Sequence, residues 1–346
     1  MARPVTGGLS RDAADLVVIG AGPAGLAAAI RGAAAGLSTL VVESATVGGQ
    51  AVLSPHLNDY PGFPEGIAGR ELVQRLYQQA LSLNVEFRAE RAIALQRLDE
   101  DCRVQLADAA ELRSRTVVLA GGAALRRTGI QGVDRLAGAG VHYNALADDP
   151  AAMTGEDVVV TGTDQAAGQA SLGLARYATN VTLVLRGGLE ATHSAELVSA
   201  IERTRNIRVR VNTQVVDAFG ESRLEGVMVR HRVSGTTEAV RARALFALFG
   251  AQPGSALVKD VIKLDELGYV LTGADLEKGR GAAGDWPLDR EPLMLETSLP
   301  GVLAAGDVRH GSSKRVTAAM LEGSVAAMQA QRYLQELQSV PVSATT

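Results

Sequence analysis

The sequence contains a single cysteine, Cys102, and this scarcity excludes several kinds of chemistry. One thiol cannot form a disulfide within the chain, cannot make the CxxC pair of a dithiol redox centre and cannot seed a cysteine zinc site. The five histidines show no clustered spacing with Asp or Glu. The residues therefore predict neither a metal site nor dithiol–disulfide exchange on this chain.

Other absences bear on location and partners. No apolar run reaches membrane-spanning length, and residues 1–14 lack the apolar core of a signal peptide. Basic and acidic residues are interspersed at a net charge of −4, without a basic stripe that would attract nucleic acid. We expect a cytoplasmic protein that binds neither membranes nor nucleic acid.

The sequence does contain two strand–turn–helix–strand units. The first runs from Asp15 to Val42 and the second from Asp157 to Leu185, and a strand at Gly301–Ala305 and a helix at Val316–Leu334 come later. This order predicts an α/β fold of two Rossmann-like, three-layer ββα dinucleotide-binding domains, the second inserted into the first. The expected bounds are 12–126 and 251–336 for the outer domain, 127–250 for the inserted domain, and 1–11 and 337–346 for flexible tails.

Three spaced glycines, Gly20, Gly22 and Gly25, lie between the first strand and its helix. In a dinucleotide-binding turn the first glycine allows the tight turn, the second lets the backbone approach a pyrophosphate, and the third lets the helix pack closely on the strand. The helix N-terminus then faces the phosphates, and Glu43, at the end of the next strand, accepts the ribose hydroxyls. The motif predicts a site for the ADP half of a dinucleotide, without separating FAD from NAD.

The C-terminal run from Thr297 to Asp307 separates the two cofactors. A strand that ends in Gly306-Asp307 just before a helix lets the carboxylate reach a ribityl hydroxyl, while the N–H groups of the helix face a flavin pyrimidine. We therefore predict that the outer domain binds FAD.

Several short motifs occur in the order of a known family. Gly48-Gly49-Gln50, Tyr60-Pro61-Gly62-Phe63, Ala120–Ala123 and Ala305-Gly306-Asp307, with the Gly20–Gly25 turn, resemble the FAD domain of low-molecular-weight thioredoxin reductases. The resemblance implies FAD, a homodimer, and FAD contacts at Gly20, Gly22, Pro23, Ala24, Gly25, Glu43, Gly49, Gln50, Asp59, Gly122, Asp307, Arg315, Val316 and Thr317. The family has Glu-Asn where this chain has Asn58-Asp59, so acid and amide are exchanged in that loop.

The second unit departs from the family in the parts that carry electrons. The family's CxxC falls on Asn144–Ala147, where both sulfurs are absent, so thioredoxin is not an expected partner. The nucleotide motif reads Gly162-Thr163-Asp164-Gln165-Ala166-Ala167, with Asp164 where a glycine would approach the pyrophosphate. Two like charges about 4 Å apart repel by on the order of 4 kcal/mol at an effective dielectric constant of 20. Asp164 can equally cap the helix that follows.

The arginine cluster that binds the 2′-phosphate of NADPH in the family is reduced to Arg186, beside Glu190. Together with Asp164, this loss predicts impaired NADPH binding. The inserted domain then serves as a scaffold or binds another ligand.

Residues other than cysteine should then face the flavin. His142, Tyr143 and Asn144 occupy the strand end where the redox loop would begin, and His310 lies in the turn after Asp307. His and Tyr transfer protons and Asn orients a carbonyl or amine, so these four are the catalytic candidates; ordinary loop residues are the alternative for the first three. Lys314 and Arg315 either stabilise a reduced anionic flavin or are solvated charges at a helix start.

Three functions fit these observations. The favoured one is an FAD-dependent oxidoreductase that oxidises a small-molecule substrate directly at the flavin. The second is a reductase driven by NAD(P)H or ferredoxin, like the thioredoxin-reductase-like ferredoxin–NADP reductases, which also lack CxxC. The third is a flavin-binding protein without enzymatic activity.

Overall fold

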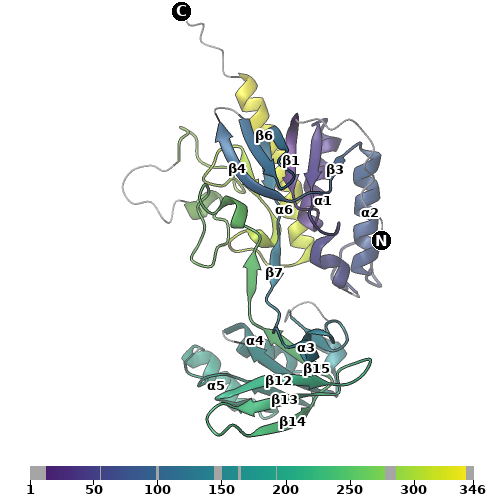
Figure 1. The fold of residues 1–346 in the computed structure, drawn as a ribbon, viewed down its shortest axis with the longest axis vertical. Coiled ribbons are helices and arrows are strands. Elements are labelled where there is room, and N and C mark those ends of the chain that lie inside the picture. The colour runs from purple at the N-terminus through teal and green to yellow at the C-terminus, as the bar shows by residue number, and fades with distance from the viewer. Residues whose placement is uncertain are drawn as a thin grey trace, which may run out of the picture. The chain divides into compact units, whose positions relative to one another are not determined.

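The computed structural model describes residues 13–54, 56–98, 101–143, 150–162, 165–191, 193–276 and 286–339 (Figure 1). The chain divides into two compact units, Met1–Ala124 with Pro253–Thr346, and Leu125–Gln252. The chain leaves the first unit through the strand β7 (Ala123–Leu125) and returns through its pairing partner β16 (Ala251–Pro253). The second unit is thus an insertion into the first, as the sequence predicts.

The first unit is built on a sheet with the order β3-β2-β1-β6-β5-β4, and β17 pairs with β6 outside this path. Its bounds are β1 Ala13–Ile19, β2 Thr39–Val42, β3 Glu86–Arg88, β4 Ala92–Leu98, β5 Asp101–Leu106, β6 Glu111–Leu119 and β17 Val302–Ala304. The strands β3, β2, β1, β6 and β17 are parallel to their neighbours, whereas β4, β5 and the start of β6 form an antiparallel meander. The parallel strands are the apolar runs of the sequence, which suit a sheet covered on both faces.

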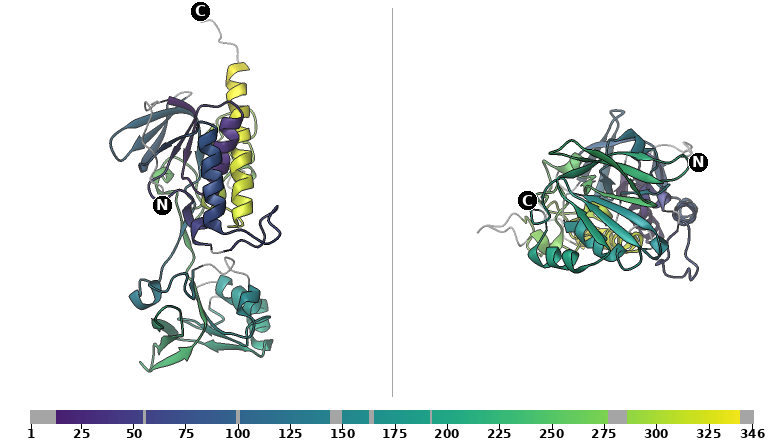
Figure 2. Two further views of the ribbon diagram at one scale, coloured as in Figure 1. Left: turned by 90° about the vertical axis from the view of Figure 1, so that its right-hand side faces the viewer. Right: turned by 90° about the horizontal axis from the view of Figure 1, so that it is seen from below.

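Three helices cover one face of this sheet: α1 (Pro23–Ala34), α2 (Gly69–Ser82) and α6 (Val316–Ser339) (Figure 2). Leu16 and Val18 of β1 pack with the alanines of α1 and α6. Val17 of β1 packs on the other face with the meander and with the segment around Val258. The alternating side chains of β1 therefore supply both layers of the core.

The inserted unit has a parallel sheet with the order β11-β10-β9-β15-β8 and an antiparallel sheet with the order β12-β13-β14. The parallel strands are β8 Val141–His142, β9 Asp157–Gly162, β10 Asn180–Val184, β11 Ile207–Arg210 and β15 Ala244–Leu248. The antiparallel strands are β12 Thr213–Phe219, β13 Gly226–His231 and β14 Thr237–Arg241, and the helices are α3 Gln131–Asp134, α4 Gln165–Leu174 and α5 Ala195–Arg203. The predicted α/β class and the two Rossmann-like domains are confirmed.

None of the helices in the described part of the chain has the length and apolarity that crossing a bilayer requires.

Candidate functional site

The turn between β1 and α1 holds the three spaced glycines. Gly20 has φ +104°, and a Cβ there would stand 2.4 Å from the carbonyl oxygen of Ala120. A Cβ on Gly25 would stand 1.8 Å from the carbonyl oxygen of Gly20, so α1 packs directly on the turn. No atom lies within 4 Å of a Cβ built on Gly22. The fold itself therefore requires Gly20 and Gly25, whereas Gly22 leaves open space for a ligand.

The open space lies at the N-terminus of α1. Gly22 is the N-cap in extended backbone, Pro23 follows at the first helical position, and no side chain caps the helix. The first N–H groups of a helix have no intrahelical partner, and they carry a partial positive charge that favours an anion. Gly49 borders the same space, because its Cβ would stand 3.4 Å from Cα of Gly22. This arrangement fits a pyrophosphate.

Ala24 contributes to packing. It is buried, and a Cβ on Gly323 of α6 would stand 2.0 Å from its carbonyl oxygen. A Cβ on Gly306 would stand 2.9 Å from the Ala24 side chain. The close approach of α1 to α6 thus fixes the turn that carries Asp307 against the glycine motif.

Glu43 follows β2, and the backbone holds both of its carboxylate oxygens. Oε2 accepts from the N–H of Ala21 at 2.8 Å and Oε1 accepts from the N–H of Ala45 at 2.8 Å. A carboxylate has about four lone-pair sites, so each oxygen keeps acceptor capacity. The position beside the glycine motif suits the two ribose hydroxyls of an ADP moiety.

The segment after β6 closes the site on its other side. The side-chain amide of Gln50 donates to the carbonyl oxygen of Ala123. Gly122 has φ +63°, with no atom within 4 Å of its would-be Cβ. The N–H of Gly254 donates to the carbonyl oxygen of Gly122 at 2.9 Å. Gln50 thereby joins the loop after β2 to the loop after β6.

Asp307 lies in the 3₁₀ turn η5 (Gly306–Val308), where it is half-buried. Burial raises the pKa of its carboxyl group, and the nearby Lys314 ammonium opposes that rise. The described residues offer it one side-chain hydrogen bond, from Oγ of Ser312 at 3.5 Å. Because half-buried carboxylates normally accept several hydrogen bonds, Asp307 has room for the hydroxyl donors of a ribityl chain. Together with the open space at Gly22 and the anchored Glu43, this fits FAD.

The turn leading into α6 is fixed by Glu322. Its Oε2 accepts from the N–H of Gly306 at 2.7 Å, and its Oε1 accepts from Nη2 of Arg309 at 2.6 Å. Val316 and Thr317, which begin α6, are half-buried. Asp59 and Arg315, both predicted FAD contacts, form an exposed pair with each other at 3.4 Å.

His310 lies in the same turn and has a carboxylate partner. Its Nδ1 is 2.7 Å from Oδ2 of Asp265, so the imidazole N–H donates to the carboxylate. Asp265 is held in turn by the N–H groups of Leu267 and Tyr269, at 2.9 and 2.8 Å. Burial raises the pKa of Asp265, but these three hydrogen bonds outweigh it and leave the pKa below its ordinary value. The His310 side chain is 45% exposed, and Nε2 has no hydrogen-bond partner among the described residues.

Sequence reasoning missed Asp265. The sequence separates it from His310 by 45 residues, and long-range contacts such as the bridge between Val270 and Arg309 bring the two segments together. The one local signal is the polar turn Asp265–Gly268, whose Asp accepts from following N–H groups as such turns commonly do. That signal indicates a turn and does not indicate a partner for a histidine.

His142 and Tyr143 belong to the inserted unit, so they are described apart from His310. The His142 ring stacks on Phe246 with the centroids 4.9 Å apart. The hydroxyl of Tyr143 donates to Oδ1 of Asp134. Burial and this carboxylate raise the pKa of Tyr143 to about 12, which does not suit proton transfer near neutral pH. Asn144 lies outside the described residues.

The turn after β9 keeps the first glycine of its motif. A Cβ on Gly162 would stand 2.5 Å from the carbonyl oxygen of Leu248 and 2.8 Å from Cβ of Ala167. Thr163 and Asp164 lie outside the described residues. The Arg186 guanidinium lies over the Phe249 ring, 5.7 Å from its centroid.

Cys102 lies in β5 and is buried among the apolar side chains beneath the sheet. Burial raises the pKa of its thiol, which keeps it in the unreactive protonated form. Within the described residues, no group of three or more His, Cys, Asp or Glu side chains could hold a metal ion.

Comparison with known proteins agrees with this geometry. Residues 14–323 match the family model described as pyridine nucleotide-disulphide oxidoreductase. The thioredoxin reductase of Mycolicibacterium smegmatis is 33% identical over 93% of this chain and 97% of its own length. A "34.2 kDa protein in rubredoxin operon" of Clostridium pasteurianum is 30% identical over 92% of this chain and 97% of its own.

A solved structure of thioredoxin reductase from Streptococcus pyogenes has a TM-score of 0.83 and 25% identity, covering 94% of this chain and all of its own. The family binds FAD, and the dithiol that thioredoxin reductases use cannot exist on a chain with one cysteine. The chain therefore belongs to the pyridine nucleotide-disulphide oxidoreductase family, as a member similar to low-molecular-weight thioredoxin reductases that lacks the CxxC motif.

Proposed function

We propose that this chain is an FAD-dependent oxidoreductase that oxidises a small-molecule substrate directly at the flavin, and that it is not a thioredoxin reductase. One observation carries the proposal: the only thiol of the chain is buried in the core, while the residues around Gly22, Glu43 and Asp307 fit FAD. Electrons that cannot pass through a dithiol must enter and leave at the flavin. We further propose that the protein is a homodimer, which light scattering on the purified protein would test, and that it is cytoplasmic.

The residues that would hold FAD are those of the first unit. The N-terminus of α1 and Gly22 would accept the pyrophosphate, Glu43 the ribose hydroxyls, and Asp307 the ribityl chain. When bound, FAD would supply the capacity for two-electron oxidation of the substrate, with oxygen or another acceptor as the final oxidant.

His310 is the residue that we assign to the accompanying proton. Its Nδ1 donates to Asp265, which fixes the tautomer and leaves the lone pair of Nε2 to accept a proton. A substrate hydroxyl or amine that is being oxidised would give its proton to that nitrogen. Asp265 positions the ring and stabilises the imidazolium that results. Tyr143 is a weaker candidate because of its raised pKa.

A second function, a reductase driven by NAD(P)H or ferredoxin, is favoured by one specific observation. The inserted unit keeps the five-stranded parallel sheet on which a nucleotide domain is built. Gly162 adds nothing to this argument, because the fold needs it for packing whatever the turn binds.

Anaerobic mixing separates these functions. We expect NADPH and NADH to bleach the flavin absorbance of the purified protein slowly or not at all, while a panel of alcohols, amines and thiols contains a fast reductant. Fast bleaching by either pyridine nucleotide would establish the reductase instead. If nothing in the panel reduces the flavin and a partner protein binds, the non-enzymatic alternative replaces both.

The role of His310 has its own test. His310→Ala should slow flavin reduction by the substrate on the order of a hundredfold while FAD content stays the same. Added imidazole should restore part of the rate, which a merely structural role would not allow. An unchanged rate in His310→Ala would remove His310 from the proposal.

A further inference from the structure

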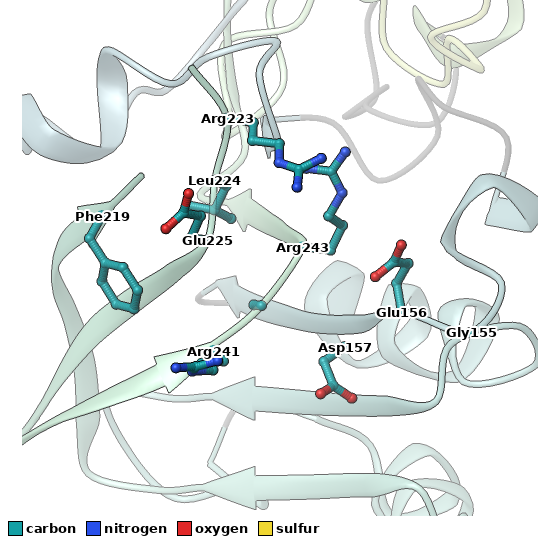
Figure 3. A pocket seen from close by; sticks show the side chains of 10 residues that line it. Gly155, Glu156, Asp157, Phe219, Arg223, Leu224, Glu225, Arg241 and Arg243 are labelled. Carbon is teal, nitrogen blue, oxygen red and sulfur yellow. The ribbon is translucent and has the colours of Figure 1, made fainter. Parts of the chain in front are cut away.

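The inserted unit contains a cavity of about 450 Å³ at the edge of its parallel sheet where β9 and β15 begin (Figure 3). Asp157 is the first residue of β9, and Arg243 immediately precedes β15, which runs parallel to β9. The nucleotide turn follows Gly162 at the other end of β9. The cavity is therefore separate from the dinucleotide site, which lies at the carboxyl edge of such sheets.

Three arginines from three segments line this cavity. Arg223 comes from the turn between β12 and β13, Arg241 ends β14, and Arg243 precedes β15. Within the described residues, none of their guanidinium groups has a hydrogen bond or an ion pair. Other arginines, such as Arg88 with Asp108, do pair with an acid, at 2.7 Å. The three cavity arginines thus keep their donors available for a ligand.

The backbone that carries these arginines is held in place before any ligand arrives. Nη2 of Arg135 donates to the carbonyl oxygen of Gly220 at 2.7 Å, and the N–H of Leu224 donates to that of Ala139 at 2.8 Å. The N–H of Arg243 donates to the carbonyl oxygen of Asp157 at 2.7 Å. Only side-chain rotations remain to be fixed on binding, which lowers its entropic cost.

Both basic and acidic side chains line the cavity. Figure 3 shows the side chains of Arg223 and Arg243 directed toward each other, with Glu156 on the side of Arg243. Two guanidinium groups that face each other repel unless an anion lies between them, and planar guanidinium groups bind phosphate oxygens through paired N–H donors. Three carboxylates, those of Glu156, Asp157 and Glu225, also line the cavity and offer acceptors that suit hydroxyl groups beside that anion. Oδ1 of Asp157 already accepts from the side-chain amide of Asn180 at 2.7 Å.

We propose that this cavity binds a small phosphate monoester that also carries hydroxyl groups. Arg223 and Arg243 bind the phosphate, Arg241 adds positive charge at the rim, and Glu156 accepts from a hydroxyl. The site is independent of the flavin and of the reaction proposed above, because every residue in it belongs to the inserted unit.

The test uses the full-length FAD-bound protein and glycerol 3-phosphate, with binding measured by calorimetry at constant ionic strength. We expect one saturable site, and affinity at least tenfold lower in the double variant Arg223→Met/Arg243→Met. The control Arg203→Met/Arg208→Met removes two exposed arginines of the same unit that do not line the cavity, and should bind like the parent. Thermal unfolding of each variant without ligand checks that the fold is kept.

A second arm addresses the hydroxyl groups. Glu156→Gln should weaken glycerol 3-phosphate binding several-fold and leave inorganic phosphate binding unchanged. The proposal is overturned if the parent shows no saturable binding, if the Arg223/Arg243 variant binds as tightly as the parent, or if the Arg203/Arg208 control loses as much. If Arg186→Met loses binding while the Arg223/Arg243 variant still binds, the phosphate lies at the nucleotide edge of the sheet. That result would also overturn the proposal.

Discussion

The β1–α1 turn and the β9–α4 turn are two copies of one arrangement, and they agree at the first glycine. A Cβ on Gly20 would stand 2.4 Å from the carbonyl oxygen of Ala120, and a Cβ on Gly162 would stand 2.5 Å from that of Leu248. In both units the turn presses against the end of a neighbouring parallel strand. This glycine is kept because the fold fails without it, whatever the turn binds.

The two turns differ at the second glycine. Gly22 has no neighbour within 4 Å of its would-be Cβ, so packing does not demand a glycine there, whereas the pyrophosphate of the proposed FAD would. The sequence has Asp164 at the corresponding position of the inserted unit. A position that packing does not constrain can change at no cost to the fold, and it is at this position that the sequences of the two turns differ.

The largest effect is expected from the glycines that both folds require. Gly25→Ala would place its Cβ 1.8 Å from the carbonyl oxygen of Gly20, and Gly162→Ala would place its Cβ 2.5 Å from that of Leu248. Each should lower the free energy of unfolding by about 3 kcal/mol or more, followed by circular dichroism in denaturant. Gly187→Ala, which meets no atom within 4 Å, should change it by less than about 0.5 kcal/mol. Equal stability of all three variants would contradict the packing argument.

Gly22→Ala should separate ligand binding from folding. The added methyl group enters open space, so stability should stay within about 0.5 kcal/mol of the parent. FAD affinity should fall on the order of a hundredfold, about 2.7 kcal/mol, because that space is needed by the pyrophosphate. Titration of the apoprotein with FAD measures it, and unchanged affinity would mean that the pyrophosphate lies elsewhere.

Asp164→Gly should make the nucleotide turn of the inserted unit more like the turn at Gly22 of the first unit. Removing the carboxylate relieves both bulk and like-charge repulsion, so NADPH should reduce the flavin faster by about tenfold or more. Asp164→Asn keeps the bulk and removes the charge, and should recover only part of the gain. Stopped-flow absorbance under nitrogen gives the rates. If neither variant responds, the nucleotide site is blocked by something other than this side chain.

Asp265→Asn tests the His310 pair through its pH dependence. The pKa of Asp265 is lowered in the folded protein, so its contribution to stability is full above the unfolded carboxyl pKa of about 3.9 and is lost as pH falls through the folded pKa. At pH 7 the variant should be about 1 kcal/mol less stable than the parent.

That difference should shrink as the pH drops below about 4. Asp260→Asn, at an exposed aspartate without a hydrogen bond among the described residues, is the matched control and should show no such convergence. Denaturant unfolding at several pH values gives the comparison, and a pH-independent loss in Asp265→Asn would show that packing rather than charge holds the turn.

The local structure around the proposed FAD site could be predicted from the sequence, because each part depends on residues close together in the chain. The Gly20–Gly25 turn, its helix from Pro23 and the acid at Glu43 are each set by neighbours in sequence. The long-range pairs could not be predicted in this way. Asp265 meets His310 because long-range contacts such as the bridge at Val270 join their segments, and Asp59 meets Arg315 from a distant loop. Such pairs depend on how loops pack, for which no residue spacing gives a rule.

Tyr143 shows that the properties of a predicted catalytic residue also depend on long-range contacts. Its residue type and its position at a strand end favour a proton carrier, but the nearby Asp134 carboxylate and burial raise its pKa to about 12. Neither factor can be read from the residues beside it. What a titratable side chain does is decided by the charge and solvent around it, and these are properties of the packed fold.

The smallest effect is expected at Cys102, the one cysteine of the chain. Its side chain is fully buried, with Sγ 3.8 Å from Nη1 of Arg97, and burial raises the pKa of the thiol. Cys102→Ala should therefore cost about 1 kcal/mol of stability through lost packing and leave turnover within about twofold of the parent. Steady-state turnover with the fast reductant, normalised to FAD content, measures it. A loss of turnover beyond tenfold at full FAD content would mean that the Cys102 thiol reaches the flavin. Sulfur chemistry would then occur on this chain even though the inserted unit lacks the CxxC pair.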